Sequence, residues 1–280
     1  MINIGIVSII IIVINFAVSY KGFNDGIFFE KYKFQVDRIL IHKEYYRLIT
    51  SGFLHVDWMH LIFNMISLYA FSELLEVNAG IINFLIIYFC SLIAGDLFAL
   101  LLHKNHGDYN SVGASGAVCG VIFASIALFP GLGIGFFILP ISIPSWLYAL
   151  LYIIYSIYGV KSNRDNIGHE AHLGGAVIGM LIAVILFPHS LTENYVPIAI
   201  VLIPCIIFIY IIITKPYILY IDNYFFKTHK KYYSIDHKYN EQKVNQQQEI
   251  DKLLDKISKK GIKSLSKNEK QKLEEYSNKR

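Results

Sequence analysis

The chain alternates long apolar runs with short polar connections. Seven runs predict helices that cross a membrane, because a spanning helix needs about 20 apolar residues. They cover residues 1–19, 59–76, 80–102, 115–129, 143–159, 171–187 and 196–214. The apolar residues in each run are continuous, whereas the strands of a membrane β-barrel would alternate apolar and polar positions. The pattern therefore predicts an all-α polytopic membrane protein.

The connections between these runs differ in character. Residues 20–58 form a long loop rich in aromatic and charged side chains, and residues 103–113 and 160–170 are short and polar. The segment 131–142 is apolar but broken by Gly and Pro, so we expect it to lie in the membrane interface rather than to span. The first run lacks the basic start and small-residue cleavage site of a secretory signal, so it predicts an uncleaved helix.

The last 66 residues have a different composition. Residues 215–280 carry 16 Lys and Arg and 9 Asp and Glu. An apolar helix face and a capping box followed by a short helix predict a helical hairpin, with a helix stop at Gly261. The face consists of Ile250, Leu253, Leu254 and Ile257, and the box of Ser266 and Glu269. The predicted division is a membrane core (1–190), an additional spanning helix (191–214) and a basic soluble tail (215–280).

Composition narrows the class of protein further. Hydrophobic residues make up 55% of the chain and charged residues 16%, where soluble domains carry roughly 25% charged residues. This excludes disordered, fibrous and ordinary soluble chains. The basic tail lacks interleaved aromatic residues, so it favours contact with anionic lipid over nucleic acid. Cys90, Cys119 and Cys205 lie in apolar runs without a CxxC neighbour, which indicates packing rather than disulfides or metal ligation.

Polar groups at membrane depth are costly and so point to function. His60 and Asn64 are four residues apart in one apolar run and share a helix face, where they present two hydrogen-bond donors. The alternative is a structural histidine near the membrane boundary.

A second pair of polar groups lies on two glycine-lined helices. Ser115 follows Gly113, which permits a tight turn, and Gly116 begins a GxxxG face with Gly120. His172 lies on one face with two glycines, Gly175 and Gly179. If these helices pack on each other, Ser115 and His172 meet in the nucleophile–base arrangement of serine acyl transfer. A serine at a helix start is otherwise most often an N-cap.

Together these motifs resemble the rhomboid intramembrane serine proteases. The resemblance runs from Tyr46 to Ala183 through Arg47, the HxxxN of His60 and Asn64, the GxSG around Ser115, and the AHxxGxxxG around His172. It implies hydrolysis of a peptide bond in or beside the transmembrane helix of a single-pass or polytopic substrate, with no cofactor or metal. By position, Ser115 resembles the nucleophile and His172 the base.

The same resemblance implies the remaining roles. His60, Asn64 and the Ser115 N–H resemble oxyanion donors, and Arg47, Gly113, Gly116, Gly175 and Gly179 resemble structural residues near the site. The spans beyond this core resemble those of the bacterial subgroup with a six-helix core and a seventh helix, in the inner membrane, and the C-terminal hairpin resembles a small extension on some bacterial members. The chain departs from the family at three places: Tyr46 stands where Trp is usual, Ser72-Glu73 where small residues are expected, and Cys119 where an aromatic ring often stacks on the histidine.

Three alternatives stay open. His169-Glu170-Ala-His172 is similar to a zinc motif, but HExxH places its histidines at i and i+4, not i and i+3. A rhomboid-like binding protein without activity would usually lack Ser115 or His172. A transporter would need charged or unwound segments in corresponding halves, and Asp96 is the one obvious acid in an apolar run.

The orientation in the membrane has two interpretations. With seven spans, the loops 20–58, 103–113 and 160–170 and the tail share one side and carry 6, 1, 2 and 16 basic residues. The positive-inside rule would place this side in the cytoplasm. The resemblance implies the opposite, since the family has these loops and the active-site face outside.

Overall fold

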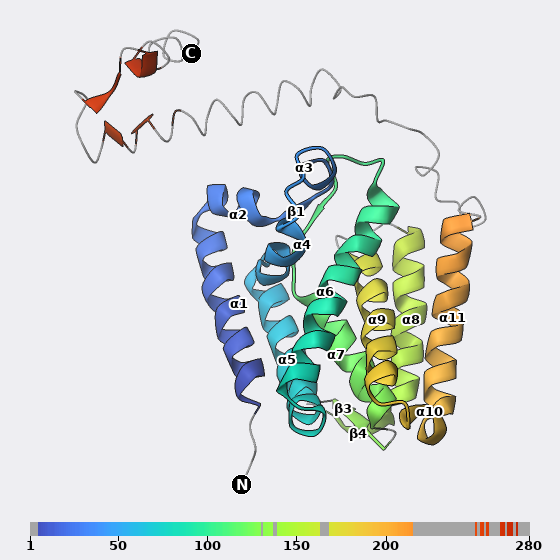
Figure 1. The fold of residues 1–280 in the computed structure, drawn as a ribbon. Coiled ribbons are helices and arrows are strands. Elements are labelled where there is room, and N and C mark those ends of the chain that lie inside the picture. The colour runs from blue at the N-terminus through green and yellow to red at the C-terminus, as the bar shows by residue number, and fades with distance from the viewer. Residues whose placement is uncertain are drawn as a thin grey trace. The chain divides into compact units, whose positions relative to one another are not determined.

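The described residues between 5 and 214 form seven long helices that lie side by side (Figure 1). The computed structural model describes residues 5–129, 131–136, 139–162 and 168–214, and in the tail residues 250, 253, 254, 256, 257, 264–266, 268–270 and 273. The long helices are α1 (Ile6–Asn24), α5 (Trp58–Ala79), α6 (Ile81–His103), α7 (Ser115–Leu128), α8 (Ser145–Ser162), α9 (His169–Leu186) and α11 (Tyr195–Thr214). Each corresponds to one of the seven apolar runs.

The predicted bounds are within three residues of the observed ones, except for the first helix. That helix was expected over 1–19, but it continues to Asn24. Apolarity marks only the part of a helix that lies in lipid, and residues 20–24, which include Lys21 and Asn24, continue the same helix. Asp25 follows this helix, and its side chain accepts a hydrogen bond from the Phe28 N–H at 2.9 Å and so caps the next helix.

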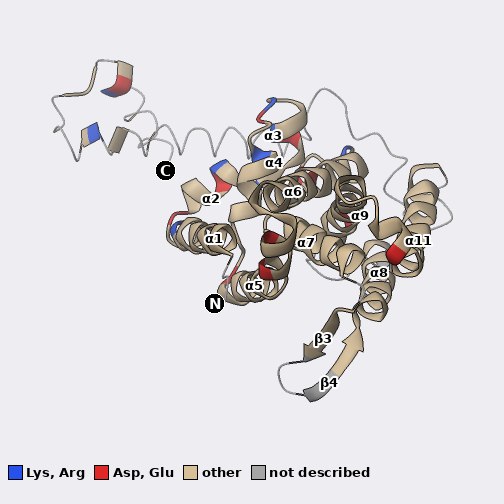
Figure 2. Ribbon diagram, turned by 60° about the horizontal axis from the view of Figure 1, so that its bottom comes forward, with Lys and Arg blue, Asp and Glu red and all other residues tan. Residues whose placement is uncertain are grey.

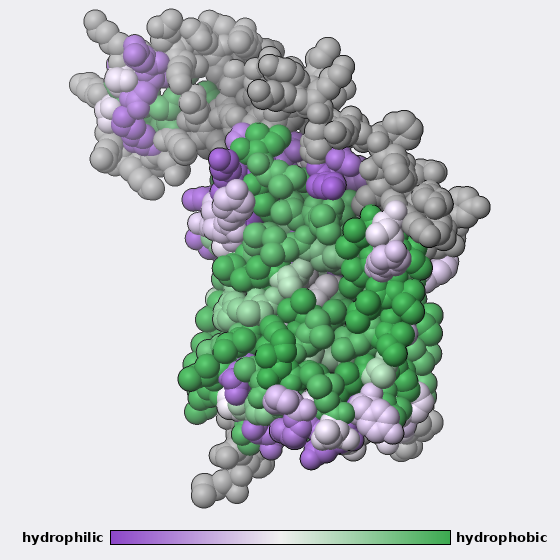
Figure 3. All heavy atoms as spheres, turned by 45° about the vertical axis from the view of Figure 1, so that its right-hand side comes forward, coloured by the Kyte–Doolittle hydropathy of each residue, from purple (hydrophilic) through white to green (hydrophobic). Residues whose placement is uncertain are grey.

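Length and hydropathy fit a membrane-crossing bundle. α1, α6, α9 and α11 are each long and apolar enough to span a membrane. α7 and the part of α8 from Ser145 to Val160 are also apolar but shorter. On the face that Figure 3 shows, apolar residues cover the middle of the described helices, and hydrophilic residues gather at the two ends. The molecule is an integral membrane protein that crosses the bilayer several times.

The short helix α7 lies at the centre of the bundle. It lies between α5, α6 and α9 (Figure 2) and packs against all three. Its residues from Gly116 to Ala127 are all buried. At 1.5 Å per residue, its 14 residues extend about 21 Å, whereas the 23 residues of α6 extend about 35 Å. α7 is therefore too short to reach both ends of the bundle.

Glycines allow α9 to pack closely on α7. A Cβ atom on Gly175 would overlap the carbonyl of Gly116, and one on Gly179 would overlap the backbone of Gly120. The two GxxxG faces thus meet in register, as expected for small-residue helix contacts. On the other side of α9, a Cβ on Gly174 would lie 3.2 Å from the backbone of α6.

The long loop before α5 contains short elements that the sequence did not predict. They are α2 (Gly26–Tyr32), β1 (Phe34–Gln35), α3 (Val36–Leu40), α4 (Arg47–Thr50) and the 3₁₀ helix η1 (Ser51–Phe53). β1 pairs antiparallel with β2 (Asn110–Ser111), which ties this loop to the segment that leads into α7. Several charged residues belong to α2, α3 and α4, as the blue and red parts of the ribbon show (Figure 2).

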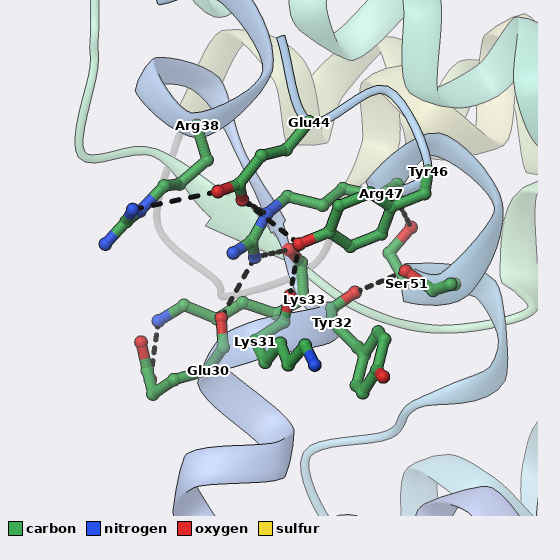
Figure 4. A network of polar contacts seen from close by, with 10 residues as sticks. Glu30, Lys31, Tyr32, Lys33, Arg38, Glu44, Tyr46, Arg47 and Ser51 are labelled. Carbon is green, nitrogen blue, oxygen red and sulfur yellow. Dashed lines mark hydrogen bonds and ion pairs between the residues drawn. The ribbon is translucent and has the colours of Figure 1, made fainter. Parts of the chain in front are cut away.

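Arg47 is the centre of a polar network in this loop (Figure 4). It is buried, and its guanidinium donates to the carboxylate of Glu44 at 2.6 Å and to the carbonyls of Glu30 at 2.9 Å and Lys33 at 2.6 Å. Burial would raise the pKa of Glu44, but the hydrogen bond and charge of Arg47 outweigh this and hold that pKa below its ordinary value. One side chain therefore joins α2, α4 and the turns between them.

The apolar segment after α7 forms a β-hairpin. β3 (Gly133–Phe136) pairs antiparallel with β4 (Leu139–Pro144), and the Ser145 N–H at the start of α8 donates to the Leu132 carbonyl at 3.0 Å. The sequence predicted that this segment does not span, but not that it forms strands. The short helix α10 (Ser190–Glu193) leads into α11, and Asn194 donates to the carbonyl of Ala127 at 2.8 Å.

Residues 227–280 form a separate unit. Ile250 and Leu253 of the predicted helix face are buried, whereas Leu254 is half exposed. The capping box is present, since the Ser266 N–H donates to Glu269 at 2.7 Å and the Glu269 N–H to the Ser266 hydroxyl at 3.3 Å. The predicted stop at Gly261 lies outside the described residues, and the division at residues 190 and 214 stays a prediction.

Candidate active site

Ser115 is the first residue of α7 and begins the helix inside the bundle. Gly113 precedes it with φ at 135°, a backbone conformation that L side chains rarely adopt, so the turn into α7 requires glycine. Ala114 occupies the N-cap position and makes no side-chain cap. The Ser115 hydroxyl is therefore free of the capping role that a serine near a helix start usually has.

His172 lies opposite Ser115 on α9. Its Nε2 atom is 2.6 Å from Ser115 Oγ, within hydrogen-bond distance. The residues are 57 positions apart in sequence and meet because Gly175, one turn after His172, packs against Gly116, the neighbour of Ser115. The structure thus brings together the serine and histidine that the sequence singled out, on the two glycine faces expected to join them.

His60 lies beside the same turn. The point where Gly113 would carry a Cβ atom is 2.9 Å from His60 Nε2 and 3.6 Å from Ser115 Oγ. Asn64 is buried one turn further along α5, and its amide donates to the His60 carbonyl at 3.0 Å. An amide has two N–H donors, so a second one remains for another acceptor. His60 is therefore close to Ser115, and Asn64 lies on the same face of α5, one turn towards its C-terminal end.

Comparison with known proteins agrees with this arrangement. A family model described as "Rhomboid domain" matches residues 42–189, more than half of the chain. The chain belongs to the rhomboid family. The match includes Arg47, both glycine-lined helices and the Ser115–His172 pair, so the family relationship covers the whole candidate site.

Individual rhomboid relatives match over a similar region. Rhomboid protein 1, mitochondrial, of Saccharomyces cerevisiae is 33% identical over 159 residues, which is 54% of this chain and 45% of the relative. RHOMBOID-like protein 12, mitochondrial, of Arabidopsis thaliana is 29% identical over 59% of this chain and 53% of its own. Rhomboid protease GluP of Bacillus subtilis is 30% identical over 52% of this chain and 27% of its own.

The chain spans about half the length of the first two of these relatives. A second family model, "Family of unknown function (DUF6576)", matches residues 233–279. The basic tail thus matches a family of its own, separate from the rhomboid domain.

Tyr152 is a site residue of this rhomboid that the sequence did not single out. It comes from α8, and its hydroxyl lies 2.9 Å from His172 Nδ1 and 3.0 Å from Cys119 Sγ. The rings of Tyr152 and His172 lie at 27° to each other with centroids 6.3 Å apart. The polar hydroxyl within an apolar run was a usable signal, but α8 carries four tyrosines and the sequence does not say which faces His172.

His55 is a second residue whose place the sequence did not predict. It is fully buried, with Nδ1 2.9 Å from the Ser19 hydroxyl and Nε2 accepting the Ala114 N–H at 3.5 Å. Its ring also meets that of His60 edge-on at 4.9 Å. Burial, and then the nearby His60, lower the pKa of His55 to about 3 against the opposing effect of Asp57, so the ring is neutral at physiological pH.

Arg47 does not reach Ser115, but its helix supports the turn. The Ser51 hydroxyl lies 2.6 Å from the Arg47 carbonyl and 2.8 Å from the buried Asp96 carboxylate. The Ser51 carbonyl in turn accepts the Gly113 N–H at 3.0 Å. This chain of contacts joins the Arg47 network to the turn that presents Ser115.

The zinc-like motif at the start of α9 does not converge on one point. Each of its three polar side chains contacts a different residue. Glu170 Oε1 lies 2.8 Å from His103 Nε2, the His169 ring packs edge-on against Tyr155, and His172 faces Ser115. Among the residues that the structure describes, no three His, Cys, Asp or Glu side chains are grouped so that they could hold a metal ion. The geometry therefore gives the metalloprotease alternative no support.

Proposed function

We propose that this rhomboid is an intramembrane serine endopeptidase that cuts a peptide bond in or beside the transmembrane helix of another membrane protein. The observation that carries the proposal is the 2.6 Å distance between Ser115 Oγ and His172 Nε2 at the N-terminal end of the short helix α7. A hydroxyl is a weak nucleophile until a base takes its proton, and His172 is placed for that transfer.

The reaction follows from this pair. Ser115 Oγ attacks the peptide carbonyl carbon while its proton passes to His172 Nε2. The tetrahedral intermediate collapses, the C–N bond breaks, and His172 gives the proton to the leaving amine. A water molecule then attacks the acyl ester with the same base, which releases the carboxylic acid and returns Ser115 to its starting state.

In this proposal the developing oxyanion is bound by N–H donors at the start of α7 and on α5. The N–H groups of the first turn of α7 have no partner within the helix, and the positive end of its dipole favours negative charge. His60 Nε2 and the second N–H of Asn64 are the side-chain donors in the proposal. Removing one such donor typically costs about 3 kcal/mol, or roughly 10²-fold in rate.

The surroundings of the site favour a membrane-embedded substrate. α5 and α8 both pack on the central helix α7, but their other neighbours differ. α5 also packs on α1 and α6, whereas α8 also packs on α9 and α11. The outer faces of both helices carry exposed apolar side chains, such as Phe63 and Ile154, that suit lipid or an apolar substrate helix. A bacterial cytoplasmic membrane is our predicted location, although the relatives include mitochondrial proteins.

Labelling with a fluorophosphonate tests the proposal without knowledge of the substrate. The probe should attach to Ser115 in the detergent-solubilised protein, and the His172→Ala variant should lose most of the labelling because its serine lacks a base. A mass spectrum that places the label elsewhere, or equal labelling of both proteins, would contradict the Ser–His dyad. The inactive binding-protein alternative predicts no labelling of the folded wild type.

A further inference from the structure

His172 makes a second hydrogen bond, on the side of the ring away from Ser115. We infer that Tyr152 is a positioning residue whose hydroxyl selects the tautomer of His172 that Ser115 needs, and that Cys119 sets the direction of this hydroxyl. The inference rests on the proposed function, because it concerns how the general base is held. The bonds that carry it are 2.9 Å from His172 Nδ1 to Tyr152 Oη and 3.0 Å from Tyr152 Oη to Cys119 Sγ.

The direction of each bond follows from the first step of the reaction. Ser115 can give its proton to His172 only if Nε2 carries a lone pair. A neutral imidazole then carries its proton on Nδ1, and this N–H needs an acceptor. Tyr152 Oη stands at the right distance to accept it.

The Tyr152 hydrogen must then point elsewhere, and Cys119 provides the place. Sulfur is a weak acceptor, and a hydrogen bond from the Tyr152 hydroxyl to Cys119 Sγ would turn the hydroxyl hydrogen away from Nδ1. In the reverse arrangement Tyr152 would donate to Nδ1, Nε2 would carry the proton, and Ser115 would have no base. In this arrangement each donor has one acceptor. The Ser115 hydroxyl donates to His172 Nε2, the His172 Nδ1–H donates to Tyr152 Oη, and the Tyr152 hydroxyl donates to Cys119 Sγ.

Cys119 also leaves room for the ring that supplies this hydroxyl. It lies one helical turn after Ser115 on α7, and its side chain is small. The ring comes from α8 and is held edge-on to Phe123 at 5.9 Å and stacked on Tyr148 at 6.1 Å. The small residue on α7 and the tyrosine on α8 therefore act as one unit.

The bond also strengthens during the reaction. When His172 takes the proton it becomes an imidazolium, and its Nδ1–H donates to Tyr152 as a charged group, which makes a stronger hydrogen bond. A neutral phenol stabilises that charge less than the aspartate of a Ser-His-Asp triad. The cost of losing it should be correspondingly smaller, on the order of 10- to 100-fold in rate, comparable to a misplacement of the base by about 1 Å.

Tyr152→Phe tests the role of the hydroxyl, because it keeps the ring and removes only one oxygen. We expect the rate of fluorophosphonate labelling at Ser115 and the kcat for a model transmembrane substrate to fall roughly 10- to 100-fold, with KM and the melting temperature unchanged. Tyr158→Phe is the matched control, because Tyr158 lies on the same helix with its ring exposed, and it should behave as the wild type. A Tyr152→Phe variant with wild-type labelling and kcat would show that the ring only fills space.

Cys119 gives a second, independent arm. Cys119→Val removes the acceptor at similar volume and should slow labelling, whereas Cys119→Ser keeps an acceptor and should not. In the Tyr152→Phe background, Cys119→Val should add no further loss, because the hydroxyl that it directs is already absent. Losses that multiply in the double variant would overturn the coupled arrangement. If Ser115→Ala is inactive while these variants match the wild type, only this inference fails, whereas full activity of Ser115→Ala would remove the proposed function itself.

Discussion

At the scale of single residues, buried polar side chains hold the turn that presents Ser115. His55 is the one whose charge state has a measurable consequence. Its folded pKa of about 3 lies below the value of about 6.5 expected for an unfolded chain, so the unfolded state binds more protons between these two values. The neutral ring stabilises the fold fully above pH 6.5, and this stabilisation is lost progressively as the pH falls towards 3.

We therefore expect the free energy of unfolding to decrease on acidification, with roughly 1.5 kcal/mol lost through His55 between pH 6.5 and pH 5. The measurement is the unfolding transition in mild detergent as a function of pH. His55→Gln, which keeps a neutral acceptor for the Ala114 N–H, should lack this part of the dependence. Identical pH profiles of the two proteins would show that His55 does not stay neutral in the fold.

Arg47 allows a second residue-scale prediction. Arg47→Lys should lower the free energy of unfolding by about 2–3 kcal/mol, because an ammonium cannot reproduce the planar set of bonds to Glu44, Glu30 and Lys33. Arg38→Lys is the matched control, since Arg38 makes a longer, partly exposed contact of 3.8 Å to Glu44 and should cost below about 0.5 kcal/mol. Equal losses in both variants would mean that the network in Figure 4 does not hold the loop.

At the scale of elements, the contact between α7 and α9 decides whether the dyad exists. Gly175→Val should inactivate the protein, because even the first atom of the new side chain would overlap the Gly116 carbonyl and push the helices apart. A shift of about 1 Å between Ser115 and His172 can cost on the order of 10²-fold in rate. Gly179→Leu should behave in the same way, because its Cβ would overlap Gly120.

The readouts are Ser115 labelling and resistance to unfolding in detergent, measured together. Gly26→Val is the control, since nothing lies within 4 Å of a Cβ at Gly26. Full labelling of both glycine variants on α9 would contradict the packing of the two faces.

The sequence predicted the long apolar helices and missed the short elements whose structure depends on tertiary contacts. Seven apolar runs gave seven helices, because a backbone in lipid must satisfy its own hydrogen bonds. The hairpin at 133–144 was missed, since Gly and Pro indicate only that a helix is broken. The partner of Ser115 was predictable because glycine spacing specifies a helix contact, but the role of Tyr152 depends on the rotation of α8, which its tyrosine-rich sequence leaves open.

At the scale of the whole molecule, the membrane bundle and the tail are separate units. Residues 1–226 contain every residue of the candidate site, and residues 227–280 form the second unit. A chain shortened after Phe226 should therefore keep wild-type labelling of Ser115 in detergent. If the tail acts by attraction to anionic headgroups, as its composition suggests, its removal should lower activity only in liposomes that contain anionic lipid. Loss of labelling in detergent would show instead that the tail supports the site.

The central claim is that Ser115 is the nucleophile of an intramembrane protease. The most direct measurement is cleavage of a model single-pass substrate in proteoliposomes by the wild type and by Ser115→Ala, with both proteins confirmed as folded and inserted. The account predicts cleavage in or beside the substrate's transmembrane helix by the wild type and none by the variant. Undiminished cleavage by Ser115→Ala would contradict it, because the short contact between Ser115 Oγ and His172 Nε2 would then have no part in the reaction.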